Sequence, residues 1–256
     1  MTDEPDGLYI ENSNEEVWKW INQYAKFNHY TNRPIANYKG ELFALPFNMW
    51  TFNQLWNVNT PAEAQKIIAE QGKDIVGEPQ NLEEQAISLV GKDVYEVLIK
   101  GYTEKQWGVK PEQLPASILA RLPVRFTSDD SYFNHPYQAI PEDGYTPIVT
   151  AMLDHPLIQV SLSTNFDSAN STDYQHVFWS GPIDAYFNFE LGHLGYRTLD
   201  FQKEVHDGDF QGCPVVNYCD VEVPYTRITE HKFFAPWESH DSTVIYKEFS
   251  RLCEAN

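Results

Sequence analysis

The chain has 256 residues, of which 42% are hydrophobic and 21% are charged, and this composition is too apolar for an intrinsically disordered protein. It carries 18 Lys and Arg against 37 Asp and Glu, so its formal net charge is −19. That charge disfavours general binding to nucleic acid or to an anionic membrane surface, and an anionic ligand has to be held by a few locally placed arginines.

The N-terminal part of the chain predicts one helix followed by a β-hairpin. Ser13 and Glu16 have the spacing of a capping box, and apolar residues recur at helical spacing over residues 17–24. Within Ile35–Phe47, two short extended runs flank Tyr38-Lys39-Gly40-Glu41, a sequence typical of a hairpin turn.

Residues 48–125 predict a small helical module. Four helices are indicated, each by a capping residue, a proline or a glycine at its ends. They cover residues 61–72, 82–91, 94–101 and 115–122. The segment Leu98–Gly108 is interpreted as a polar, glycine-bracketed loop between helices.

Residues beyond Phe126 predict mainly strands, with one helix at Tyr145–Leu153. The run Val177–Gly181 is apolar and ends in small residues, as in a strand buried on both faces. The predicted strands are Val160–Ser163, Val177–Ser180, Val215–Tyr218 and Val221–Pro224.

These elements divide the chain into three predicted domains. Residues 1–47 hold the helix and the hairpin, residues 48–127 the helical bundle, and residues 128–256 the substrate-binding β-sheet. The expected fold class is therefore α+β, with a helical insert domain and a mainly antiparallel β-sheet domain.

Several common active-site motifs are missing from the sequence. It contains no GxGxxG, no P-loop, no HExxH and no GxSxG. The cysteines form no CxxC pair and no two histidines are four residues apart, so no metal site is expected. The chain has neither a long apolar run nor the basic and apolar start of a secretory signal, and we expect a cytoplasmic protein.

The segment Leu98–Gly108 is the first that suits a nucleotide. Its aromatic side chains, Tyr102 and Trp107, are able to stack on a base or a sugar. The alternative is that both are half-buried anchors of the loop.

Two further segments bring arginine and tyrosine together. Arg121, Arg125 and Tyr132 lie within Ser117–Phe133, where guanidinium forks and a phenol suit phosphate oxygens. The alternative there is salt bridges to some of the many acids. The strand-like segment Val215–Lys232 suits either a diphosphate or an ordinary sheet surface. Its polar side chains include Asn217, Tyr225, Arg227 and His231.

The same segments carry a family resemblance. The run Leu-Ile-Lys-Gly-Tyr-Thr-Glu-Lys-Gln-Trp-Gly at residues 98–108 closely resembles the hallmark of UDP-galactopyranose mutases. The resemblance extends over nearly the whole chain from about Asn12 onward. It continues in order through residues 114–118, 121–126, 129–133, 137–141, 181–184, 195–199, 215–218 and 223–232.

The resemblance implies a site for a UDP-sugar. In the family, the residues matching Tyr102 and Thr103 line the uridine site, and those matching Trp107 and Arg121 lie on a mobile loop that closes over the substrate. The arginines matching Arg121 and Arg227 meet the diphosphate and are the implied catalytic pair. The other implied contacts are Tyr132 to phosphate, Asn217 in the same pocket, Asn32 at the sugar and Arg197 at the cofactor. Arg125 is interpreted as structural.

The resemblance also implies the chemistry. The family interconverts UDP-galactopyranose and UDP-galactofuranose through a covalent adduct of reduced FAD, and galactofuranose is used in cell-surface polysaccharides. Members begin with a strand and a glycine-rich FAD fingerprint. This sequence has no such fingerprint; residues 6–12 are Asp-Gly-Leu-Tyr-Ile-Glu-Asn, and the sequence stops before the family's last segment. The resemblance thus implies an incomplete nucleotide-binding, Rossmann-like domain.

Three alternative functions are considered for this chain. The first is the mutase reaction, an isomerisation that uses reduced FAD. The second, which we expect for the chain alone, is binding of UDP or UDP-galactose without flavin and without catalysis. The third is a scaffold that only mediates protein interactions. Apolar surface without a packing partner also favours a homo-oligomer.

Overall fold

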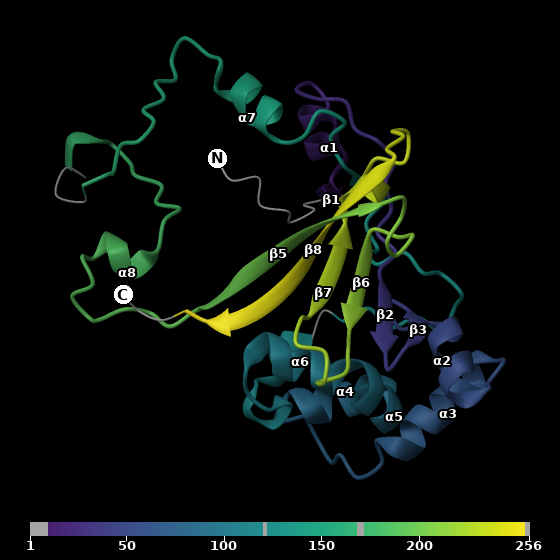
Figure 1. Cartoon of the computed structure of the whole chain (residues 1–256). Helices are drawn as coiled ribbons and strands as arrows, with labels where there is room; N and C mark the ends of the chain where they lie inside the picture. The colour runs from purple at the N-terminus through teal and green to yellow at the C-terminus, as the bar shows by residue number, and fades with distance from the viewer. Residues whose placement is uncertain (1–9, 120–121, 168–171, 254–256) are drawn as a thin grey trace.

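The computed structural model describes residues 10–119, 122–167 and 172–253. A six-stranded sheet lies between a group of helices at one end and a smaller part with α1, β1 and α7 at the other (Figure 1). The α-helices are α1 (Glu15–Ile21), α2 (Met49–Trp56), α3 (Pro61–Gln71), α4 (Leu82–Val90), α5 (Lys92–Val94), α6 (Lys100–Trp107), α7 (Thr146–Leu153) and α8 (Ile183–Tyr186). The strands are β1 (Ile10–Asn12), β2 (Ile35–Tyr38), β3 (Glu41–Ala44), β4 (Tyr137–Ala139), β5 (Arg197–Asp207), β6 (Val215–Tyr218), β7 (Arg227–Glu230) and β8 (Ser242–Leu252).

The large sheet has the strand order β3-β2-β6-β7-β8-β5. Its pairs are antiparallel except for β2 and β6, which run parallel, so the prediction of a mainly antiparallel sheet is confirmed. The register places Asn217 opposite Arg227, and Arg227 opposite Glu248. Because directly opposite residues point to the same face of a sheet, these three polar side chains share one face.

The hairpin predicted within Ile35–Phe47 is confirmed as β2 and β3. Its turn residues Lys39 and Gly40 have φ angles of 51° and 88°. Two consecutive positive φ angles are typical of the tight turn whose twist matches that of two antiparallel strands.

Two of the predicted helices are confirmed with their caps. Helix α3 begins after Thr60, whose hydroxyl accepts from the Glu63 N–H, and α4 begins after Asn81. The first helix, α1, is also present, but the prediction of Ser13 as its cap was wrong. The side chain of Asn14 accepts from the N–H groups of Glu16 and Val17 instead.

The interpretation of residues 98–108 as a loop was wrong. A π-helical stretch, Tyr95–Ile99, leads directly into α6, which ends at Gly108 with φ 70°. Gly101 lies inside α6 and faces Cys219, the residue after β6. A Cβ at position 101 would overlap the carbonyl oxygen of Cys219, so glycine allows the helix to approach the sheet closely. The helix predicted over residues 115–122 is described only as a 3-10 turn, Ala116–Leu119.

Three of the predicted strands were also wrong. Residues 160–163, 177–180 and 221–224 form no strand. Phe178 is 92% exposed, whereas a strand buried on both faces would hide it. A short β-branched or aromatic run becomes a strand only where a neighbour pairs with it, and these segments have no such neighbour in the described chain. The predicted helix near Tyr145–Leu153 is confirmed as α7.

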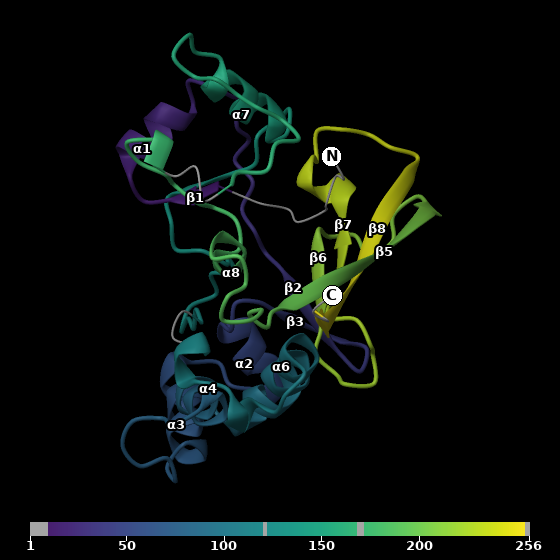
Figure 2. The ribbon, with the colours of Figure 1, turned by 90° about the vertical axis from the view of Figure 1, so that its left-hand side faces the viewer.

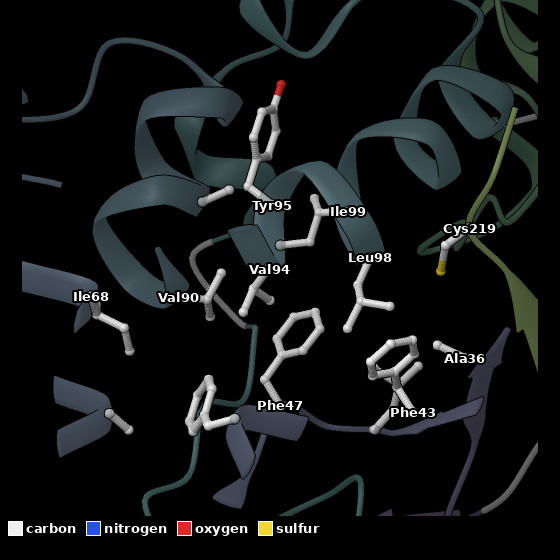
Figure 3. Packing of buried hydrophobic residues seen from close by; sticks show 14 of the residues in the cluster. Ala36, Phe43, Phe47, Ile68, Val90, Val94, Tyr95, Leu98, Ile99 and Cys219 are labelled. Atoms are coloured by element: carbon white, nitrogen blue, oxygen red, sulfur yellow. The ribbon is translucent and has the colours of Figure 1, made fainter. Parts of the chain in front are cut away.

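The main hydrophobic core joins the hairpin to the helices. Phe43 and Phe47 lie beneath Leu98 and Val94, with Cys219 of the sheet at one side (Figure 3). Burial of such side chains gives about 1.5–3 kcal/mol each and fixes the helices against one end of the sheet. The division of the chain into three domains, with boundaries after residues 47 and 127, remains a prediction.

The smaller part of the molecule lies away from this core in both views (Figures 1 and 2). In it, β1 pairs with β4 and Trp18 stacks on Tyr137 at 5.3 Å between ring centroids. Its Rossmann-like character remains a prediction. None of the helices in the described ranges is both long and apolar enough to cross a membrane.

Candidate functional site

A cavity of about 370 Å³ lies between α6, the end of the hairpin and the sheet. Its wall combines aliphatic side chains such as Leu98 with polar groups from α6, β6 and β7. The predicted site residues that line it are Tyr102, Thr103, Trp107, Tyr132, Asn217 and Arg227. Segments that are far apart in the sequence therefore meet around one cavity.

Helix α6 supplies one wall of the cavity through its periodicity. Ile99, Tyr102, Thr103 and Gln106 are spaced by three or four residues, and all four line the space. Trp107 lies at the end of the helix and is 39% exposed, so its ring borders both the cavity and solvent. A helix holds these side chains in fixed relative positions, which the predicted loop would not.

The sheet supplies the opposite wall, with Arg227 at its centre. The guanidinium donates through Nε to Asn217 Oδ1 at 3.1 Å and through Nη2 to the Tyr102 hydroxyl at 3.2 Å. The first contact follows from the register of β6 and β7, and the second joins the sheet to α6. Arg227 is therefore oriented from two sides before any ligand is considered.

Glu248 is a buried carboxylate behind Arg227 that the sequence analysis missed. It is 5% exposed, and its Oε2 lies 3.6 Å from Arg227 Nη1. The Thr226 hydroxyl donates to Glu248 Oε1 at 2.9 Å and so fixes the carboxylate. No sequence pattern indicates this contact, because it depends on the pairing of β8, a strand that was not predicted.

Both tyrosine hydroxyls at the cavity stay protonated at neutral pH. Burial raises the pKa of Tyr102, although the nearby Arg227 charge opposes this effect. Burial likewise raises the pKa of Tyr132, and ionisation of Tyr102 would raise it further. Each phenol can therefore donate a hydrogen bond to an anionic ligand.

Asn32 and Arg125 support the segment that carries Tyr132. The Tyr132 N–H donates to the Asn32 carbonyl at 2.8 Å, and Asn32 itself is buried. Arg125 donates to the Ser131 carbonyl and to Asn134 Oδ1, as the structural interpretation of Arg125 requires. Asn32 does not belong to the cavity lining, and its contact with a sugar remains a prediction.

Two predicted site residues remain. Arg121 falls outside the described residues. Arg197 donates to Ser250 Oγ at 3.1 Å and to the Lys105 carbonyl at 3.4 Å, near the C-terminal end of α6. A cation at a helix C-terminus is favourable, and this contact gives Arg197 a structural role, whereas its cofactor role remains a prediction.

The start of α1 does not fit the pyrophosphate of FAD. A dinucleotide needs backbone N–H groups that are available at a helix start. The Asn14 side chain occupies those of Glu16 and Val17, and Glu15 and Glu16 add negative charge in the first turn. In the described ranges, no group of three or more His, Cys, Asp or Glu is arranged to hold a metal ion.

The chain belongs to the UDP-galactopyranose mutase family, whose profile matches residues 97–256. It is 52% identical, over 95% of its length, to a probable UDP-galactopyranose mutase of Klebsiella pneumoniae. It is 49% identical, over 94% of its length, to a dTDP-fucopyranose mutase of Escherichia coli. The chain spans 64% and 66% of the lengths of these two relatives.

A solved structure supports the fold. The crystal structure of a reduced UDP-galactopyranose mutase matches 96% of this chain and 63% of that chain, with a TM-score of 0.65 and 12% sequence identity. This likeness confirms an architecture of helices with a mixed sheet, in line with the predicted α+β class.

Proposed function

We propose that the cavity between α6 and the sheet binds the nucleoside diphosphate part of a sugar nucleotide, with a UDP-sugar as the first candidate. The observation that carries this proposal is the guanidinium of Arg227, which borders the cavity and is held by Asn217 and Tyr102. In a chain of net charge −19, an arginine held in a fixed orientation beside a cavity favours binding of an anion at that place.

The other wall residues suit the rest of such a ligand. Thr103 and the aromatic rings of Tyr102 and Trp107 offer a polar group and flat faces to the uridine. The Tyr132 hydroxyl and Arg227 offer donors to the diphosphate, and Arg121 is the proposed second arginine. Donors already in place at the diphosphate also stabilise charge that develops there when a bond to the sugar breaks.

As a family member, the chain is proposed to serve the interconversion of UDP-galactopyranose and UDP-galactofuranose. That isomerisation uses reduced FAD, and the start of α1 does not fit its pyrophosphate. We assign sugar-nucleotide binding to the cavity residues named above. Cytoplasmic location and self-association remain predictions.

Titration calorimetry with UDP tests the proposal. We expect saturable binding of UDP at pH 7, and weaker binding of ADP, because the larger purine would have to fit between the same side chains of the cavity. Absence of UDP binding by the folded chain would contradict the proposal.

A second candidate ligand comes from the relatives. The identity to the dTDP-fucopyranose mutase, 49%, is close to the 52% identity to the probable UDP-galactopyranose mutase. Titration with dTDP under the same conditions separates the two candidates. A higher affinity for dTDP than for UDP would favour the deoxythymidine nucleotide.

Flavin binding gives a separate prediction. After incubation with excess FAD and gel filtration, we expect the protein to elute without flavin absorbance, because the sequence contains no GxGxxG to hold the pyrophosphate. A yellow protein whose colour is bleached by dithionite would overturn this expectation and would favour the mutase reaction for the chain itself.

A further inference from the structure

Lys105 forms an unusual junction between α6 and the sheet. Its ammonium group donates to three backbone carbonyl oxygens, those of Tyr218 at 2.6 Å, Tyr225 at 2.9 Å and Val223 at 3.0 Å. All three acceptors lie in one segment, residues 218–225, which connects β6 to β7. The side chain lies on the helix that carries Tyr102 and Thr103 but does not line the cavity.

This junction lies between the two walls of the proposed nucleotide site. The 218–225 segment begins next to Asn217 and ends two residues before Arg227, while Lys105 lies about one helical turn after Tyr102. The same segment approaches the helix at Gly101, where a side chain would overlap the Cys219 carbonyl. Lys105 therefore fixes the distance between the phenol on α6 and the guanidinium on β7.

The number of donors matches the number of acceptors only while Lys105 is charged. An ammonium has three N–H groups, and three carbonyl oxygens accept them. A neutral amine has two N–H groups and a lone pair, and that lone pair would face an oxygen. In the described ranges no ion pair of Lys105 is present that would replace the lost contact.

The surroundings favour the neutral form at moderately high pH. Burial lowers the pKa of Lys105 to about 8, and charge on Cys219 or Asp220 would oppose this. Burial raises the pKa of Tyr218 and that of Cys219 to about 12, so both stay neutral near pH 8. The titratable and charged groups on the elements packed here include Tyr102, Glu104, Arg197, Tyr218, Cys219, Asp220, Glu222, Tyr225, Arg227 and Glu248.

We propose that Lys105 is a positioning residue for the nucleotide site: its ammonium holds the 218–225 segment against α6, and loss of its proton loosens the junction and weakens UDP binding. The inference rests on the proposed function. It predicts that the affinity for UDP falls as the pH rises and Lys105 loses its proton, although Lys105 does not line the cavity.

The test compares UDP affinity at pH 7 and pH 9 in the unaltered chain and in Lys105→Met. The methionine retains an unbranched side chain but has no donor. We expect binding by Lys105→Met to be about tenfold weaker at pH 7, the scale of one to two lost hydrogen bonds, and nearly equal to the unaltered chain at pH 9. The unaltered chain itself should lose about fivefold in affinity over this range, because only a minority of Lys105 stays protonated at pH 9.

Two matched variants separate positioning from charge and from misfolding. Lys100→Met removes a positive charge from the same helix, where Lys100 pairs with Glu96, and should follow the unaltered chain at both pH values. Lys105→Arg retains its charge above pH 9 and should show no loss of affinity between pH 7 and 9. Circular dichroism melts establish that each variant is folded.

The outcomes are distinct. UDP binding that is unchanged in folded Lys105→Met overturns the inference alone. Equal losses in Lys100→Met and Lys105→Met overturn it as well, because they indicate a general charge effect. If Lys105→Met does not fold, a pH-independent affinity of the unaltered chain overturns it. Absence of UDP binding by the unaltered chain at pH 7 refutes the proposed function and this inference together.

Discussion

Arg227→Ala is expected to weaken UDP binding by ~1.5–3 kcal/mol, which is about 10-fold to 150-fold in affinity. The guanidinium is the charged donor that borders the cavity in the described chain, and its Nε and Nη2 contacts fix its orientation. Calorimetry at pH 7 measures the change. Arg121→Ala is predicted to have an effect of the same size.

Arg227→Lys refines this result. Lysine keeps the positive charge but cannot donate to Asn217 and Tyr102 in the same plane, so we expect an intermediate loss of affinity. The matched control is Arg251→Ala, since Arg251 lies on β8 and its exposed side chain pairs with exposed Asp200. Removal of that surface pair should change UDP affinity little. Unaltered UDP affinity in both Arg121→Ala and Arg227→Ala would refute the assignment.

Glu230→Ala is expected to lower the free energy of unfolding by ~3 kcal/mol. Glu230 ends β7 and is fully buried. Its carboxylate accepts from the backbone N–H groups of Phe210 at 2.9 Å, Gln211 at 2.7 Å and Gly212 at 3.1 Å. Alanine would leave three donors without their acceptor, and urea unfolding followed by circular dichroism measures the loss.

Two variants control for this effect. Glu41→Ala removes an exposed carboxylate from β3 and should change the free energy of unfolding by less than ~0.5 kcal/mol. Glu230→Gln keeps the size of the side chain but presents an amide N–H group to donors, so about half of the loss is expected. Equal stability of Glu230→Ala and Glu41→Ala would show that the loop at residues 208–212 does not depend on the carboxylate.

The parts of the fold that were predicted are those with local causes. The hairpin turn at Lys39-Gly40 and the start of α3 at Thr60 each depend on residues within four positions of one another. Strands β5 and β8 were missed because their charged and apolar residues occur in short runs without a regular period, and they become strands by pairing with each other over 11 residues. The segment Val177–Ser180 shows the converse, a strand-like composition without a partner.

The same distinction between local and distant causes applies to the residues of the candidate site. The resemblance indicated Tyr102, Asn217 and Arg227, and the structure brings these three together. It gave no indication of Glu248, which is placed by cross-strand register, or of the contacts of Lys105, which cross from a helix to a distant turn. The helical state of residues 100–107 was missed because the glycine at position 101 was interpreted as a helix end rather than as a point of close packing.

The parallel pairing of β2 with β6 has a consequence for how the chain folds. Ala36 pairs with Asn217, and the hydrogen bond from Arg227 to Tyr102 spans 125 positions of the chain. Contacts of such high contact order form late, after the local helices and the hairpin. A nascent polypeptide thus exposes the aliphatic lining of the future cavity until Arg227, the last lining residue in the sequence, has been synthesised.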